Sequence, residues 1–131
     1  HLTFLQTAYR AIDLGHESEE ARESLTTHKN CTFGQWYHQL GQQHYGHLPS
    51  YVKIDQPHHA FHESISNMIE DLRSLETENM DEDLSNKIYQ KMEVAENMSS
   101  AITENITSLI DEKLKFEGHG QAVATTEIDL F

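Results

Sequence analysis

Two histidines spaced four residues apart, His58 and His62, form the pattern in this sequence that most directly suggests chemistry. A spacing of four places both imidazoles on one face of an α-helix. They belong to an apolar stripe made of Tyr51, Ile54, His58, His62, Ile65, Ile69 and Leu72. A stripe of this kind faces a protein core. Because burying an imidazole without a partner costs free energy, either hydrogen-bonding groups or a metal ion must satisfy the pair.

Two further metal-ligating side chains stand at comparable places in other segments. His1 lies on an apolar stripe in the first segment, and Cys31 lies at the start of the second. One thiolate and three neutral imidazoles make a tetrahedral set that suits Zn²⁺. A position in a first helical turn would also favour the thiolate form of Cys31. Four protein ligands leave no open coordination position for a substrate, so such a site is structural or sensory. The alternative to a metal is that buried hydrogen bonds satisfy His58 and His62.

The apolar residues that carry these side chains recur at helical spacing. They predict four helices, over residues 1–15, 30–43, 51–75 and from 81 or 84 to about 116. Gly15 is the expected end of the first helix and Asn30 the expected N-cap of the second. Pro57 predicts a kink or a restart in the third, with Asp55 as a possible cap. One additional helical turn is expected around residues 19–25.

Four helices without any strand-like alternation predict an all-α, antiparallel four-helix bundle. The fourth helix, at roughly 30 residues, would span about 45 Å and reach past a single bundle. This length predicts a homodimer. The bundle is expected to occupy residues 1–116. Residues 117–131 show no helical period and are predicted to be a flexible tail with an apolar end, Ile128 to Phe131.

Composition narrows the class of protein. The chain has 131 residues, 37% of them hydrophobic and 24% charged, which fits one globular domain. The net charge of −13 argues against nucleic-acid binding. No apolar run approaches the length of about 20 residues that a membrane span needs, and no secretory signal is visible. The single cysteine, Cys31, excludes a disulfide within this sequence and favours a reducing, cytoplasmic compartment.

Taken together, three patterns resemble the chemoreceptor zinc-binding (CZB) domain, a bacterial family of four-helix-bundle zinc sensors. They are His1 on the first helix, the run Cys31-Thr-Phe-Gly-Gln-Trp36, and His58-x-x-x-His62. The resemblance covers residues 1 to about 110. Phe4 stands where the family usually has Trp, so an aromatic side chain is kept. The resemblance implies that His1, Cys31, His58 and His62 are zinc ligands.

The resemblance further implies a cytoplasmic sensory domain, not an enzyme, that controls an attached or partner signalling module of the chemotaxis or diguanylate cyclase type. The signal would be zinc itself or an oxidant such as hypochlorous acid. An oxidant would convert the Cys31 thiolate to a sulfenic acid, which is a poor ligand. Loss of the metal would also release the Cys31 segment, because metal-binding free energy contributes to folding in such sites.

Other interpretations of the sequence stay open. A hemerythrin-like di-iron bundle would use inward carboxylates, for which Glu63, Glu70 and Asp71 are candidates. A metal-free docking domain is another alternative to the zinc sensor. An enzyme with a Cys–His nucleophile pair would need an oxyanion loop, and none is visible in the sequence.

The remaining histidines carry less information. His44 and His47 are three residues apart and fit a polar loop better than a second metal site. No partner pattern is visible for His16, His28, His38 and His119. Gly34 within a helix is expected to allow close packing against the third segment.

Overall fold

The computed structural model describes residues 1–78 and 82–117. Within these ranges all regular structure is helical, which confirms the predicted all-α class. The elements are α1 (Leu2–Leu14), α2 (Glu19–Glu23), α3 (Thr32–Trp36), the π-helical turn η1 (Tyr37–Gly41), α4 (Gln42–Tyr45), α5 (Pro49–Thr77) and α6 (Glu82–Glu117). Residues 118–131, which include His119 and the apolar end of the predicted tail, lie outside the described residues.

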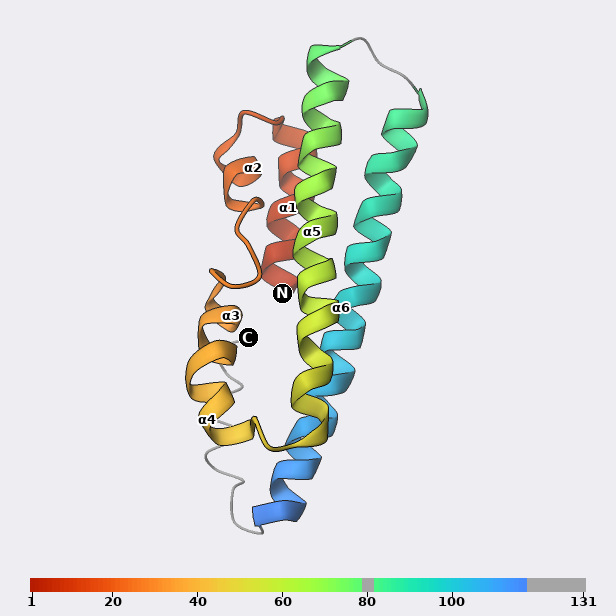
Figure 1. Ribbon diagram of the computed structural model, residues 1–131. Helices are drawn as coiled ribbons and strands as arrows, with labels where there is room; N and C mark the ends of the chain where they lie inside the picture. The colour runs from red at the N-terminus through yellow and green to blue at the C-terminus, as the bar shows by residue number, and fades with distance from the viewer. Residues whose placement is uncertain (79–81, 118–131) are drawn as a thin grey trace.

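An antiparallel hairpin of the two long helices, α5 and α6, runs the length of the molecule (Figure 1). Helix α1 covers one half of this hairpin with α2 beside it, and the run α3–η1–α4 lies along the other half (Figure 1). The covering helices therefore follow one another along the hairpin. Since the described ranges do not place four full-length helices side by side, the four-helix bundle stays a prediction. The homodimer stays a prediction as well.

The buried face of the hairpin follows the apolar stripes seen in the sequence. Side chains with at most 2% exposure come from α5 (Ile54, Phe61, Ile65, Met68) and from α6 (Ile88, Met92, Ala95, Ile102, Leu109). Their spacing of three and four residues keeps them on one face of each helix. Met68 and Met92, both in this buried set, fill the core between the two long helices. None of the helices within the described ranges has an apolar run long enough to cross a bilayer.

The first helix and the connection after it match the expectation. Leu5, Ala8 and Ala11 are the buried residues of α1, and the two alanines have no exposed surface. Gly15 ends the helix with φ at 104°, a backbone conformation that residues other than glycine rarely adopt. Ser18 then caps α2 by accepting a hydrogen bond from the backbone N–H of Ala21 at 3.1 Å.

The second predicted helix differs in its start and in its form. The N-cap is Cys31 and not Asn30, because the Cys31 sulfur accepts the backbone N–H of Gly34 at 3.3 Å. The helical run continues past the predicted end to Tyr45, and its middle is the π-helical turn η1. A π-helical turn inserts an extra residue into the spiral and changes the direction of the side chains that follow it.

The third helix is continuous from Pro49 to Thr77, so of the two expectations at Pro57, a kink or a restart, the restart is wrong, and Asp55 caps nothing. Proline has no N–H to donate to the carbonyl of Lys53, four residues earlier. The side-chain amide of Asn105 on α6 lies 3.5 Å from that carbonyl oxygen and replaces part of the lost hydrogen bond. Such compensation by a neighbouring group is a physical reason why a packed helix can pass through a proline.

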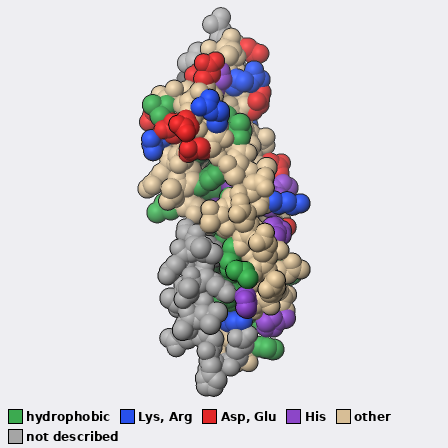
Figure 2. Space-filling model, turned by 90° about the vertical axis from the view of Figure 1, so that its left-hand side faces the viewer, with side chains coloured by type: hydrophobic (Ala, Val, Ile, Leu, Met, Phe, Trp, Pro, Cys, Tyr) green, Lys and Arg blue, Asp and Glu red, His purple; other side chains and the backbone are tan. Residues whose placement is uncertain are grey.

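The far end of the hairpin is tied by polar contacts. Glu112 on α6 accepts the backbone N–H of Ser50 at 2.9 Å, which places a carboxylate at the N-terminus of α5. Lys113 donates to the carbonyl of His44 at 2.7 Å. On the face formed by α2, α3 and α4, acidic and basic side chains gather toward the α1 and α2 end, and histidines reach the surface at mid-height (Figure 2).

Candidate metal centre

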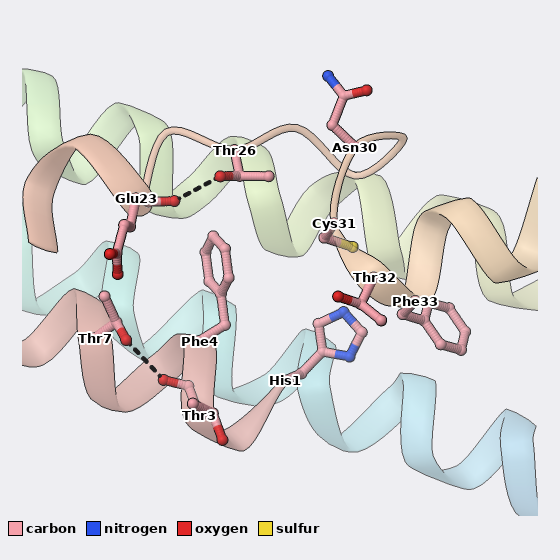
Figure 3. A pocket seen from close by; sticks show the side chains of 10 residues that line it. All are labelled: His1, Thr3, Phe4, Thr7, Glu23, Thr26, Asn30, Cys31, Thr32 and Phe33. Carbon is pink, nitrogen blue, oxygen red and sulfur yellow. Dashed lines mark hydrogen bonds between the residues drawn. The ribbon is translucent and has the colours of Figure 1, made fainter. Parts of the chain in front are cut away.

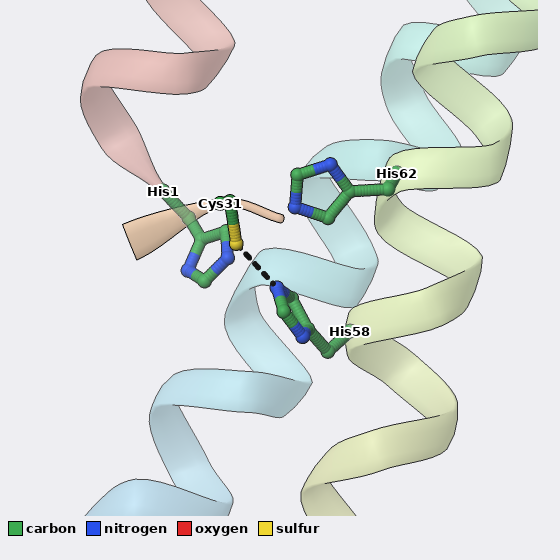
Figure 4. Close-up of side chains that lie close together, drawn as sticks. All are labelled: His1, Cys31, His58 and His62. Atoms are coloured by element: carbon green, nitrogen blue, oxygen red, sulfur yellow. Dashed lines mark hydrogen bonds between the residues drawn. The ribbon is translucent and has the colours of Figure 1, made fainter. Parts of the chain in front are cut away.

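Four metal-ligating side chains, those of His1, Cys31, His58 and His62, converge where α1, the start of α3 and α5 meet (Figure 4). Each offers one ligand atom, and these four atoms lie within 4.8 Å of one another. The Cys31 sulfur is 3.2 Å from Nε2 of His58. His58 and His62 are buried, with exposures of 1% and 2%, while His1 and Cys31 are partly buried. We call these four residues the buried cluster.

The position of each ligand follows from its local structure. His58 and His62 belong to the buried stripe of α5, one helical turn apart, between the fully buried Ile54 and Ile65. His1 immediately precedes α1, and its carbonyl accepts the N–H of Leu5 at 2.9 Å, so its position is fixed by the helix start.

The orientation of His62 is set by a backbone carbonyl. Nδ1 of His62 lies 2.8 Å from the carbonyl oxygen of Thr26. Because a carbonyl only accepts hydrogen bonds, Nδ1 carries the hydrogen and Nε2 carries the free lone pair. Metal-ligating histidines are commonly held in this way by a carbonyl on the nitrogen that faces away from the metal. The Thr26 carbonyl therefore prepares Nε2 of His62 as a ligand atom.

Several nitrogens of the buried cluster have no hydrogen-bond partner among the described residues. They are Nε2 of His1, Nε2 of His62 and Nδ1 of His58, and each is buried. A buried polar atom without a partner costs about 1–3 kcal/mol. A cation bonded to the two Nε2 atoms would remove that cost, so the donor set fits a metal ion.

Burial also fixes the protonation of the imidazoles. Desolvation is the largest cause that lowers the pKa of His58 to about 3 and that of His62 to about 4. Both rings are therefore neutral near pH 7, which is the form that binds metals.

For the Cys31 thiol the effect of burial is opposite to the sequence expectation. Desolvation raises the pKa of Cys31, and the hydrogen bond from the Gly34 amide lowers it by less. The expectation that a helix N-terminus would favour the thiolate is thus outweighed by burial, in part because α3 has only five residues. A thiolate at this position needs a cation beside it.

Gly34 fixes the loop that carries Cys31. A Cβ atom at this position would lie 1.8 Å from the carbonyl oxygen of His28, a distance that no side chain tolerates. Close approach was expected from the sequence, but the partner is the loop before α3 and not the third helix. The same His28 carbonyl lies 3.7 Å from the Cys31 sulfur. Only glycine permits this compact turn.

Aromatic rings enclose the buried cluster. Phe33 packs against His58 with ring centres 4.9 Å apart, Phe61 against His1 at 4.9 Å, and Phe4 against His62 at 4.6 Å. Phe4 is thus a wall of the site. The Trp36 ring packs on Phe33 and Tyr45, one layer further out.

One side of the buried cluster opens to solvent. A cavity of about 480 Å³ lies between α1 and the loop leading to α3, and His1, Phe4, Thr26, Cys31 and Phe33 are among its lining residues (Figure 3). The Cys31 sulfur and the His1 ring both border it. A small solute can therefore reach the sulfur without unfolding of the chain.

The carboxylates considered for a di-iron site lie elsewhere. Glu63 faces His59 at 3.4 Å, Glu70 pairs with Arg73, and Asp71 pairs with Lys91. None of them belongs to the buried cluster. His44 and His47 also lie outside the clusters of three or more metal-ligating residues found in the described ranges.

Sequence reasoning missed a second cluster, formed by His28, His38 and Asp55. The three residues come from the loop after α2, from η1 and from α5. Their spacing in the chain carries no period, so only the folded loop brings them together.

Comparison with known proteins gives one match. A family model described as the chemoreceptor zinc-binding domain matches residues 1–69. The matched range includes all four residues of the buried cluster. Comparisons with curated proteins and with solved structures found no match.

Proposed function

This chain belongs to the chemoreceptor zinc-binding domain family, and from that premise we propose that His1, Cys31, His58 and His62 bind one Zn²⁺ ion. The observation that carries the proposal is the convergence of their ligand atoms within 4.8 Å, with buried Nε2 atoms on His1 and His62 that have no hydrogen-bond partner in the described part of the chain. Bound zinc would supply the positive charge that keeps Cys31 a thiolate. Three imidazoles and one thiolate are a common tetrahedral zinc set.

The proposed role is sensory and not catalytic. Four protein ligands leave no coordination position for a substrate. We propose that the domain works in the cytoplasm and reports to a chemotaxis or cyclic-di-GMP signalling module. We further propose a homodimer in which the hairpins of two copies form a four-helix bundle. The exposed apolar side chains Tyr89 and Val94 on α6 support such a contact.

The proposed signal is an oxidant, and hypochlorous acid is the example with the right chemistry. The Cys31 thiolate and hypochlorous acid give a sulfenic acid and chloride: sulfur gains the hydroxyl and loses two electrons, and chlorine gains them. The cavity that borders the sulfur supports access by a molecule of this size. A sulfenic acid is a poor metal ligand, so oxidation weakens the connection between the start of α3 and α5.

Zinc availability would act on the same connection. Without a metal, Nε2 of His1 and Nε2 of His62 lack hydrogen-bond partners among the described residues. The Cys31 segment then contacts α5 through the Cys31 sulfur, 3.2 Å from Nε2 of His58, and through the Phe33 ring, which packs on His58. Metal binding then adds directly to the folding free energy of this region. Both signals therefore converge on the attachment of α3 to α5.

The experiment that tests this proposal is metal analysis followed by oxidation. Purified protein should contain zinc near one per chain; iron near two per chain, or no metal, would overturn the zinc assignment. Hypochlorous acid should then release zinc, followed with a chelating indicator, in step with a sulfenic acid trapped on Cys31 and identified by mass spectrometry. Zinc release without modification of Cys31 would contradict the redox role.

A further inference from the structure

The second cluster, His28, His38 and Asp55, has the composition of a metal site in its own right. Its ligand atoms lie within 4.8 Å of one another. Two imidazoles and a carboxylate are typical ligands of Zn²⁺, Co²⁺ and Ni²⁺. In a tetrahedral zinc site with ligand bonds near 2.1 Å, ligand atoms are about 3.4 Å apart. Small side-chain rotations would bring the ligand atoms from their present separations to this distance, and the exposed His38 side chain has room to rotate.

Asp55 gives the independent sign that a cation is missing. Its Oδ1 atom is buried and has no hydrogen-bond partner among the described residues. Nε2 of His28 lies 3.9 Å from this oxygen, too far for a hydrogen bond. A buried carboxylate oxygen that faces an imidazole nitrogen across such a gap is the arrangement that a bridging cation would satisfy.

The second cluster adjoins the buried cluster. The His28 ring lies 5.7 Å from the ring of His58, centre to centre, and the His28 carbonyl contacts the Cys31 sulfur at 3.7 Å. Asp55 precedes His58 by three residues on α5, which places them one turn apart. The two clusters thus share a wall. The second one is more open to solvent, because His38 is exposed and the Asp55 side chain keeps 49% of its surface in solvent.

We propose that His28, His38 and Asp55 bind a second divalent transition-metal ion, more weakly than the buried cluster, and that this site loads zinc into it. Three protein ligands leave a coordination position for water, so the ion can exchange readily. A zinc ion held here would need to move only one side-chain layer to reach His58. The loading role rests on the proposed zinc function, whereas the existence of the second site does not.

Stoichiometry tests the site. Titrated with Zn²⁺, metal-free protein should bind two ions per chain, one tight and one weak. H38A and D55N should each weaken the second ion at least about tenfold, as expected for loss of one of three ligands. H47A, which removes an exposed histidine elsewhere, should still bind two. If the unaltered chain binds one ion, or if H38A and D55N leave the weak ion unaffected, the second site does not exist.

Cobalt separates this proposal from the zinc function. With Co²⁺, only the cluster that contains Cys31 should give a thiolate-to-metal absorption band, and the second equivalent should add none. If the thiolate band is missing while an ion sensitive to H38A still binds, the proposed zinc site at the buried cluster is wrong and the second site is supported. If the thiolate band appears and no second equivalent binds, the second site is wrong and the buried site is supported.

The rate of zinc uptake tests the loading role. In stopped-flow mixing, H38A should fill the buried cluster several-fold more slowly, while its equilibrium zinc affinity at that cluster stays unchanged. H47A should fill it at the rate of the unaltered chain. Equal rates for H38A and the unaltered chain would overturn the loading role.

Discussion

Two clusters of metal-ligating side chains lie on neighbouring turns of α5 and differ mainly in burial. In the buried cluster His58 and His62 are almost without exposed surface and are enclosed by phenylalanines. In the second cluster His38 is exposed, and the Asp55 side chain keeps 49% of its surface in solvent. Similar ligand types therefore stand in two different dielectric surroundings within one short segment.

This difference teaches how burial assigns a role to a ligand set. An empty buried cluster leaves polar atoms without partners, so its metal is coupled to folding. In an empty second cluster only the buried Oδ1 of Asp55 lacks a partner among the described residues, while water can solvate the exposed His38, so loss of its metal should cost the fold less. The first arrangement suits a sensor, and the second suits exchange with solvent.

Removing zinc should give the largest effect and should separate the two clusters. Chelation should lower the free energy of unfolding by about 4 kcal/mol when free zinc had been 1,000 times the dissociation constant. Thermal unfolding with and without a chelator measures this. Chelation should lower the free energy of unfolding of D55N by the same amount, because the second cluster contributes little to folding. A much smaller decrease in D55N would show that the second cluster stabilises the fold.

The next largest effect is expected for Cys31→Ser. Zinc affinity at the buried cluster should fall by more than about 100-fold, or about 2.7 kcal/mol, measured by competition with a chelating indicator. Serine is a good N-cap, so the start of α3 should be kept. The metal-free variant should therefore unfold at nearly the same urea concentration as the unaltered chain. Unchanged zinc affinity would contradict ligation by the sulfur.

Gly34→Ala should disturb both clusters at once, since the His28 carbonyl lies against Gly34. The added methyl group cannot fit 1.8 Å from that oxygen, so the loop must move. Overpacking of this kind costs about 2 kcal/mol of unfolding free energy, measurable with denaturant. Zinc affinity should fall as well. Gly46→Ala, at the C-cap of α4, is a matched control because its added Cβ would also lie too close to a backbone oxygen, 2.4 Å from that of Gln42, but away from both clusters. An equal loss of zinc affinity there would argue against a specific role of the loop.

The sequence predicted the long helices well because their apolar residues are strongly periodic. The stripes on α5 and α6 appear in the structure at the residues expected, and Gly15 ends α1. The failures come from contacts that periodicity does not encode. Asn105 supports the helix across Pro57 from another element, and a sulfur replaces the usual oxygen as the cap of α3.

The two clusters show the same limit at the level of the site. His58 and His62 could be found from spacing alone, and His1 and Cys31 from their places at the starts of segments. His28, His38 and Asp55 could not, because the turn that joins Gly34 to the His28 carbonyl depends on a backbone contact between residues six apart in an irregular loop. A pattern search sees side-chain types along one element, whereas this cluster combines a loop, a π-helical turn and a helix.

The dependence of zinc affinity on pH should also distinguish the clusters. Burial raises the pKa of the Cys31 thiol above its ordinary value near 9, so the metal-free thiol is protonated at neutral pH. Binding must release that proton, and affinity should therefore rise about tenfold, or 1.4 kcal/mol, for each pH unit between 7 and 9. His58 and His62, with pKa values of about 3 and 4, add no dependence in this range.

Titrations at several pH values would test this slope. The weak second ion, which has no thiol ligand, should show a flat affinity over the same range. An equal slope for both ions would mean that proton release does not come from Cys31.

The smallest effect should come from Tyr37→Phe, which affects only the half of the molecule that carries His38. The hydroxyl of Tyr37 donates to the Tyr51 carbonyl at 2.7 Å, and that of Tyr51 donates to the Tyr37 carbonyl at 2.6 Å. The two rings are stacked with centres 4.2 Å apart. Phenylalanine keeps the stacking and removes one hydrogen bond, so unfolding free energy should fall by about 1 kcal/mol in a urea titration.

Because η1 is attached to α5 through this pair, binding of the weak second ion should decrease, while zinc affinity of the buried cluster stays the same. Tyr89→Phe, at an exposed position on α6, should change neither quantity. An equal decrease at both clusters would show that they do not differ in the elements that position them.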